Sequence, residues 1–178
     1  MNAVTVRPLR PEDHEAVAEL TLASYLDGGH IDPDDGYRHV LADVASRAEQ
    51  AEVLVAEVRD ENGTHVAGSV VLSPFGTPMA ETSVAGEYEF RMLAVHPNFH
   101  RRGVAAALMD EVERRARAEG NEAIALTTMT SMTDAHRLYE RRGFVRVPER
   151  DWMLRDILPD LPPEQEKGPF IVYRLKLR

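Results

Sequence analysis

Cysteine is absent from the 178 residues, and its absence removes several kinds of chemistry. Without a thiol there is no disulfide framework, no thiolate nucleophile, and no cysteine-ligated zinc or iron–sulfur centre. Long apolar runs are missing too, because a stretch such as residues 104–109 is far shorter than the roughly 20 residues that span a bilayer. The first residues lack the charged end and apolar core of a signal peptide. We therefore expect a cytoplasmic protein with no membrane partner.

Basic residues are scarce in the first third of the chain. Residues 1–65 hold 5 basic and 14 acidic residues, whereas residues 66–178 hold 16 of each, so the net charge of −9 arises entirely before residue 66. Nucleic-acid binding depends on Lys and Arg that neutralise phosphates, so we expect no nucleic-acid partner. An acidic surface beside a site would instead attract cations.

Length, periodicity and turn residues predict one domain over residues 1–178. The expected strands are residues 3–6, 53–58, 66–72, 87–95, 123–128, 144–147 and 170–177. The expected helices are residues 12–26, a second helix opened by residues 32–36 that carries Tyr37, Val40, Leu41 and Val44 on one face, a third between Gly103 and Gly120, and a fourth over residues 134–142. Residues 73–86 are expected to form a surface loop. The order of these elements predicts a mixed α/β fold, with antiparallel strands in the first part of the chain and a βαβα section in the second part. It differs from the element order of a doubly wound Rossmann fold.

The stretch from Leu93 to Met109 carries the clearest chemical signal. A strand ends, a short loop turns at Arg101, Arg102 and Gly103, and a helix of small residues begins. Backbone N–H groups at such a helix start converge on one point, a geometry that binds pyrophosphate. The loop matches neither the Walker P-loop nor the Gly-x-Gly-x-x-Gly dinucleotide pattern.

These residues resemble the GCN5-related N-acetyltransferase (GNAT) superfamily, whose acetyl-CoA signature is Gln/Arg-x-x-Gly-x-Gly/Ala. The signature corresponds to residues 100–105, and the resemblance extends upstream over residues 89–97 and downstream over the Ala-x-x-Leu-Tyr-x-x-x-Gly-Phe element at residues 135–144. It implies the GNAT acyl-CoA N-acyltransferase fold, with mostly antiparallel N-terminal strands and a parallel βαβ cofactor section. It also implies direct acetyl transfer from acetyl-CoA to an amine in a ternary complex.

The resemblance further implies residue roles. The backbone of Leu93, Ala94 and Val95 would pair with the pantetheine arm. The loop that would hold the pyrophosphate comprises His100, Arg101, Arg102, Gly103, Val104 and Ala105, with Gly103 allowing close approach of phosphate to backbone. Tyr139 would donate a proton to the leaving thiolate, and Glu89 would take one from the amine, with Glu87 as second choice.

Two positions depart from the family pattern, and the two expected catalytic residues also have purely structural interpretations. His100 replaces Gln or Arg, and Met132 stands where many members have Asn. Glu89 could be only a charge partner for Arg91, and Tyr139 a core aromatic. His96 and His100 have the spacing of ligands on a helix, but Pro97 breaks any helix there, so we expect no metal.

The acceptor is less defined by the sequence. The acidic connection between the first two helices contains Asp34 and Asp35. These carboxylates predict a small cationic amine or peptide amine as the acceptor. The expected aromatic contacts of this amine are Tyr25, Tyr37 and Trp152. The alternative is that these acids are solubilising surface. Two other functions remain: a non-catalytic acyl-CoA-binding sensor, and an O-acyl or longer-chain acyl transferase. We expect a monomer or homodimer.

Overall fold

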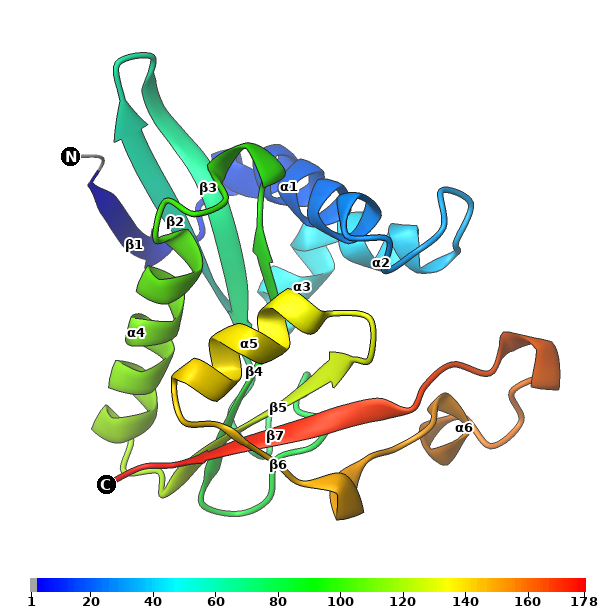
Figure 1. Cartoon of the computed structure of the whole chain (residues 1–178). Helices are drawn as coiled ribbons and strands as arrows, with labels where there is room; N and C mark the ends of the chain where they lie inside the picture. Colours follow the sequence, from blue (N-terminus) through cyan, green and yellow to red (C-terminus); the bar gives the residue numbers. More distant parts are fainter. Residues whose placement is uncertain (1–2) are drawn as a thin grey trace.

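Residues 3–178 form a seven-stranded mixed sheet with helices on both faces in a computed structural model (Figure 1). The strands are β1 (Val4–Pro8), β2 (Glu52–Asp60), β3 (Gly63–Leu72), β4 (Glu87–Val95), β5 (Ala123–Met129), β6 (Val145–Arg146) and β7 (Phe170–Lys176). Their order in the sheet is β1-β2-β3-β4-β5-β7-β6. Only β4 and β5 pair in parallel, and the other neighbours are antiparallel. The predicted mixed α/β fold is confirmed.

Two groups of helices cover the sheet, and the alternation of side chains along β2 shows how. The helices are α1 (His14–Asp27), α2 (Tyr37–Ala42), α3 (Val44–Gln50), α4 (Val104–Ala118), α5 (Thr133–Arg141) and α6 (Leu154–Ile157). Leu54 belongs to the buried cluster that includes α4, whereas the next residue, Val55, packs with Val17 of α1 and Val44 of α3. Successive strand residues point to opposite faces. Hence α4 lies on one face, and α1 and α3 lie on the other.

The second predicted helix is two helices. Asp43 interrupts the apolar periodicity with φ −82° and ψ 71°, which lies outside the helical region. Its carboxylate accepts a hydrogen bond from the Ser46 N–H at 3.0 Å and so caps α3. Because an Asp side chain can satisfy an orphan N–H at a helix start, the chain restarts a helix there instead of continuing one.

The C-terminal strands also differ from the prediction. Residues 144–147 contribute only the two paired residues of β6, because Pro148 begins a short 3₁₀ turn over Pro148–Arg150. Residues 149–169, which no periodicity assigned, include the single turn of α6. This segment returns the chain to β7, which pairs between β5 and β6.

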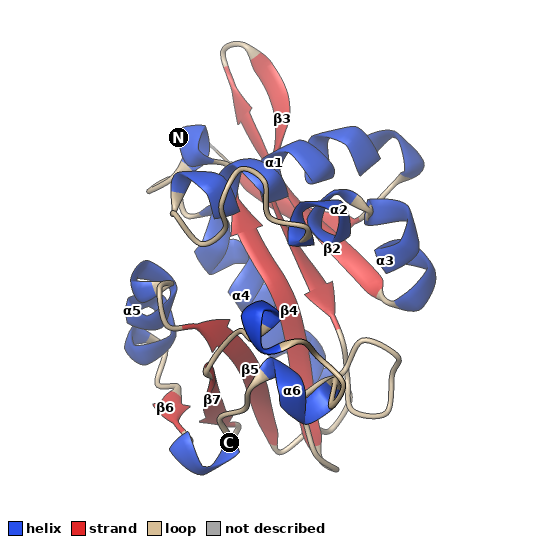
Figure 2. Cartoon of the chain, turned by 90° about the vertical axis from the view of Figure 1, so that its right-hand side faces the viewer, coloured by secondary structure: helices blue, strands red, loops and turns tan. Residues whose placement is uncertain are grey.

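A bulge and a divergence in β4 shape the centre of the sheet. Between Arg91 and Ala94 the pairing of β4 with β3 shifts by one residue, and Met92 has φ 51°. A bulge bends its strand and re-aims side chains. On its other side, β4 pairs with β5 only from Glu87 to Glu89, and beyond that point the two strands separate (Figure 2). The second half of β4 therefore keeps an edge that β5 does not fill.

None of the helices in residues 3–178 combines the length and the apolar character that crossing a bilayer needs.

Candidate functional site

The loop between β4 and α4 presents a run of free backbone N–H groups. The first backbone hydrogen bond of the helix runs from the Ala107 N–H to the Gly103 carbonyl at 3.0 Å. Among residues 3–178, no acceptor lies within hydrogen-bond distance of the N–H groups of residues 101–106. Two of these residues have positive φ, Arg101 at 59° and Gly103 at 80°. The resulting turn leaves the N–H groups of a long helix free to bind an anion.

Gly103 is required for its backbone conformation. A Cβ built at this position would meet no atom within 4 Å, so space in the protein alone does not demand glycine. A φ of 80° does, because a Cβ makes the left-handed region unfavourable by roughly 1–2 kcal/mol. The open space is also where an anion could approach the backbone.

The side chains of the loop contribute less than its backbone. Arg102 lies 3.3 Å from a carboxylate oxygen of Asp60 in the β2–β3 hairpin, and its guanidinium stacks over Phe99 at 5.2 Å from the ring centroid. Arg101 and His100 are exposed. Val104 is buried against the sheet, and Ala105 is half-buried in the first turn of α4. The backbone N–H groups are thus the main anion-binding feature.

The predicted pantetheine-binding strand lies on the unfilled edge of β4. Ala94 and Val95 pair with Ser69 and Gly68 of β3 on one side only. Leu93 follows Met92 in the bulge. A strand with one free edge can accept an extended ligand as an additional strand.

Tyr139 lies on α5 with its ring in the core and its hydroxyl at the boundary. The residue is 5% exposed, and its ring packs against Phe90, Phe144 and Tyr173. The hydroxyl forms no hydrogen bond to protein within residues 3–178, yet it is not among the enclosed unpaired polar atoms. Burial raises the pKa of Tyr139 above its usual range, so the phenol remains protonated and able to donate.

Glu89 is fully buried and supports the preceding loop. Its carboxylate accepts hydrogen bonds from the backbone N–H groups of Glu81, Thr82 and Ser83, with the shortest at 2.9 Å. Residues 73–86 are the predicted surface loop, and no helix or strand forms there. Arg91, the partner that the sequence suggested for Glu89, instead pairs with Glu81 at 2.7 Å.

The Glu87 carboxylate also has partners within the protein. It is 3% exposed and forms ion pairs with Arg150 at 2.9 Å and Arg174 at 2.6 Å. Burial, the largest influence, raises the pKa of Glu87, but the two arginines outweigh it and hold that pKa below its usual range. Glu87 thus ties β4 to β7 and to the turn at Pro148–Arg150.

The sequence motifs did not indicate Glu81, whose side chain pairs with Arg91 and lines a cavity beside β4. Its side chain is 25% exposed. Burial raises the pKa of Glu81, and the neighbouring Arg91 opposes that effect. The sequence does not indicate Glu81 as a site residue, because it lies in a loop without periodicity whose backbone path depends on Glu89.

A cavity of about 380 Å³ opens beside the β4 bulge. It is lined by residues of α2, α3, the 73–86 loop and β4: Tyr37, Val40, Asp43, Ser46, Arg47, Gln50, Pro78, Met79, Glu81, Arg91 and Met92. The rings of Tyr25 and Tyr37 lie 6.4 Å apart, so the structure brings two of the predicted aromatic contacts together. Burial raises the pKa of both phenols.

Of the predicted acceptor residues, Tyr37 lines this cavity, whereas Tyr25, Asp34, Asp35 and Trp152 do not. Asp34 is exposed, and Asp35 forms an ion pair with Lys167 at 2.8 Å. Trp152 stacks on Phe170 at 4.4 Å, and its indole N–H donates to the Thr127 hydroxyl. Asp35 is therefore already compensated by a cation of the protein itself.

Met132, the position that departs from the family pattern, has an apolar role. It packs with Tyr25, Ile31 and Leu41 in a cluster between the first helices and the β5–α5 connection. Throughout residues 3–178, no three histidine, aspartate or glutamate side chains gather as a metal site would require.

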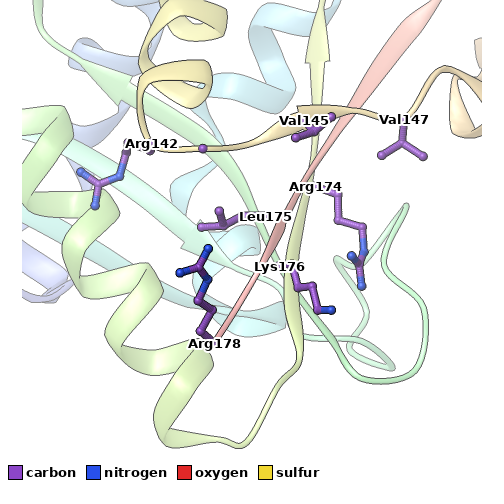
Figure 3. Close-up of a pocket in the computed structure, with 8 residues that line it drawn as sticks. Arg142, Val145, Val147, Arg174, Leu175, Lys176 and Arg178 are labelled. Carbon is purple, nitrogen blue, oxygen red and sulfur yellow. The ribbon is translucent and has the colours of Figure 1, made fainter.

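A larger cavity of about 720 Å³ lies at the β6–β7 edge of the sheet (Figure 3). Its lining consists of Arg142, Gly143, Val145, Val147, Arg174, Leu175, Lys176 and Arg178. None of the predicted site residues lines it, so the candidate site is the β4–α4 loop together with the smaller cavity beside β4.

The chain is similar to one family of known proteins. A family model described as the acetyltransferase (GNAT) family matches residues 14–144, which include both the β4–α4 loop and Tyr139. No curated protein matches the chain.

Several solved structures share the fold. An acetyltransferase of the GNAT family from Staphylococcus aureus Mu50 has a TM-score of 0.70 at 15% identity, covering 99% of this chain and 100% of its own. The PaiA N-acetyltransferase from Thermoplasma acidophilum, solved in complex with coenzyme A, has a TM-score of 0.68 at 15% identity, covering 98% and 99%. The ribosomal-protein-S18-alanine N-acetyltransferase from Escherichia coli has a TM-score of 0.62 at 18% identity, covering 98% and 94%.

Proposed function

The chain belongs to the acetyltransferase (GNAT) family, and from this premise we propose that it transfers the acetyl group of acetyl-CoA directly to a primary amine in a ternary complex. The observation that carries the proposal is the run of free N–H groups over residues 101–106, placed where β4 and β5 separate. These donors suit the pyrophosphate of coenzyme A. Acetyl-CoA, as co-substrate, supplies the activated thioester.

The chain's own contribution to cofactor binding is mostly backbone. The N–H groups of residues 101–106 hold the phosphates, with the positive end of the α4 dipole behind them. The free edge of Leu93, Ala94 and Val95 holds the pantetheine arm. Arg101 adds charge from an exposed position, whereas Arg102 is already paired with Asp60.

Tyr139 is the proposed general acid. Its phenol is kept protonated by burial and has no protein acceptor within residues 3–178, so its proton is available to a departing sulfur. A positioned proton donor of this kind contributes roughly 10²–10⁴-fold to a rate.

Two glutamates are candidates for the general base: Glu89, which the resemblance implies, and Glu81, which we propose in its place. A base must reach the proton that it takes, directly or through one water. The Glu89 carboxylate is fully buried and holds three N–H groups of the loop, whereas the Glu81 carboxylate lines the cavity beside β4. This access favours Glu81, and Glu89 would then act by fixing the loop that carries it.

The proposed acceptor is a small cationic amine or peptide amine that binds in the cavity beside β4, which Tyr37 lines. The second candidate function is a non-catalytic acyl-CoA-binding sensor. The engagement of both Glu87 and Glu89 by protein partners is the observation that favours it.

One experiment tests the proposed function. The purified protein is titrated with acetyl-CoA and with CoA by calorimetry, and thiol release is then measured over a panel of amines. We expect micromolar binding and acceptor-dependent release. Binding without release over the panel would favour the sensor, and no binding would refute the cofactor site.

Tyr139→Phe tests the acid. We expect kcat to fall by roughly 10²-fold or more while acetyl-CoA affinity stays unchanged. The melting temperature should also hold, because the hydroxyl has no protein partner to lose within residues 3–178. An unchanged kcat would leave Tyr139 as a core aromatic only.

Glu81→Gln and Glu89→Gln separate the two bases. A base acts when deprotonated, so activity falls as pH drops through its pKa. Burial raises the pKa of Glu81, so its acidic limb should lie above the usual glutamate value. We expect Glu81→Gln to remove this limb from the kcat/KM profile, and Glu89→Gln to lower the melting temperature and keep the limb. The reverse pattern would assign the proton transfer to Glu89.

A further inference from the structure

Arg47 of α3 is a buried cation without a carboxylate partner. It is 4% exposed, and no carboxylate in residues 3–178 lies within ion-pair distance of it. Its Nη1 donates to the carbonyls of Val40 at 2.9 Å and Leu41 at 2.8 Å. Its Nε is enclosed and has no acceptor at all.

This arrangement is unfavourable for the protein by itself. Charged side chains are rarely buried unless paired, because removal from water disfavours the charged form. Burial accordingly lowers the pKa of the Arg47 guanidinium. Several other arginines of the chain have carboxylate partners: Arg7, Arg91, Arg115, Arg142, Arg146, Arg150 and Arg174. Arg47 thus lacks the carboxylate partner that these arginines have.

Arg47 is one of the residues that line the cavity beside β4. Its Nη2 forms no hydrogen bond to protein within residues 3–178 and, unlike Nε, is not enclosed. A ligand in this cavity can therefore reach the guanidinium.

Neither of the carboxylates that line the cavity forms an ion pair with Arg47. Glu81 and Arg91 form an ion pair with each other at 2.7 Å. The Asp43 carboxylate accepts a hydrogen bond from the Ser46 N–H and caps α3. The Asp43 carboxylate acts on Arg47 electrostatically but lies beyond ion-pair distance of it. Arg47 is therefore the cation of the cavity lining that has no carboxylate in contact with it.

We propose that the acceptor amine also carries a carboxylate, and that Arg47 binds this carboxylate in the cavity beside β4. The inference rests on the proposed function and deepens it by naming the acceptor class: amino acids or short peptides with a free carboxylate. Guanidinium and carboxylate form charge-assisted, often bidentate hydrogen bonds. The cavity extends to Met92 in the β4 bulge, next to the strand edge proposed for the pantetheine arm, so carboxylate and amine are held on the acceptor side together.

A purely structural role for Arg47 makes a different prediction. If Arg47 serves only to hold the last carbonyls of α2, Arg47→Met lowers stability and changes all acceptors alike. If Arg47 serves the acceptor, Arg47→Met discriminates between acceptors. Methionine has similar volume and removes a buried charge, a change that proteins often tolerate.

The test uses matched pairs of acceptors in the thiol-release assay. L-Alanine, L-methionine, L-lysine and glycylglycine are each compared with their carboxamides. We expect the wild-type protein to prefer at least one carboxylate over its amide by about tenfold or more in kcat/KM. Arg47→Met should abolish this preference by raising KM for the carboxylate, with KM for the amide unchanged. Arg47→Lys, which keeps the charge, should restore part of it.

Arg38→Met is the matched control. Arg38 lies on the neighbouring α2, does not line the cavity, and donates to the Pro33 carbonyl. We expect this variant to keep the preference. Equal kcat/KM for carboxylates and amides in the wild-type protein would overturn the inference and leave the acetyltransferase proposal intact.

If no acceptor of the panel releases thiol, calorimetry decides. The same carboxylates and amides are titrated into the CoA-loaded protein and into its Arg47→Met variant. Binding of a carboxylate that Arg47→Met abolishes would support the inference without turnover. Equal or absent binding of both kinds of probe would overturn it. Failure of acetyl-CoA itself to bind would instead refute the proposed function.

Discussion

At the scale of single residues, the site depends on backbone conformation more than on side-chain charge. The sequence motif predicts that Arg101 and Arg102 add charge to the loop. The Arg102 side chain, however, forms an ion pair with Asp60 and stacks on Phe99. The proposed anion-binding groups are N–H donors, and their exposure depends on the left-handed turn at Gly103.

Gly103→Ala should therefore weaken acetyl-CoA binding by at least about tenfold, because an L residue at φ 80° either strains the turn by roughly 1–2 kcal/mol or changes it. Calorimetry measures the affinity. Gly120→Ala is the matched control at the other end of α4: it too has positive φ, 74°, with no atom within 4 Å of a built Cβ. It should lower the melting temperature similarly and leave the affinity unchanged. Equal affinity losses would contradict a specific role for Gly103.

At the scale of elements, the position of α4 on the sheet is set by Gly68 of β3. A Cβ at Gly68 would lie 2.6 Å from Val104 Cγ1 and 3.0 Å from the Ala94 carbonyl. The absence of a side chain lets the first turn of α4 approach the sheet where β4 has its free edge. One glycine in β3 thus fixes the relation between the N–H groups and the strand edge.

Gly68→Ala should push α4 outward, lower stability by about 1–3 kcal/mol, and reduce acetyl-CoA affinity. Thermal unfolding and calorimetry measure the two effects. Adding Val104→Ala removes the nearest contact, so the double variant should recover part of the stability and part of the acetyl-CoA affinity. No recovery would mean that the Ala94 carbonyl, and not α4, limits the space.

At the scale of the whole molecule, buried carboxylates hold together segments far apart in the chain. Glu87 joins β4 to β7 and to the turn at Pro148–Arg150, and Glu89 fixes the 81–83 segment beside the acceptor cavity. Glu87 is the first residue of β4 that pairs with β5, and Glu89 is the last. The paired part of β4 is therefore tied by carboxylates to β7 at one end and to the 81–83 segment at the other.

Glu87→Gln should reduce stability at neutral pH by about 3 kcal/mol, because it leaves two arginines without their buried partner. The folded pKa of Glu87 is held below its usual value, so its contribution is fully present above the unfolded pKa and is lost as pH falls through the folded value. Denaturant titrations from pH 7 to pH 3 should show a shallower acid loss for the variant. Glu149→Gln, an exposed change in the same turn region, is the control. Parallel curves for Glu87→Gln and wild type would contradict this assignment.

Fold class and family could be predicted from the sequence alone, and the phosphate-binding loop is a prediction from the same kind of pattern. These features reside in local patterns: strand alternation, helical periodicity, and a glycine at a strand-to-helix turn, each of which acts within a few residues. The sequence also placed Tyr139 on the apolar face of its helix, and its burial agrees with that position.

Only the tertiary structure decided what the charged residues do, because ion pairs join residues distant in sequence. The pairing of Asp35 with Lys167 and the enclosure of Glu89 by the 81–83 segment follow from how segments meet. The same holds for Arg47, which the sequence presents as an ordinary helical arginine. Its burial without an anion appears only when α2, α3 and β4 enclose it, and that is what points to the carboxylate of the acceptor.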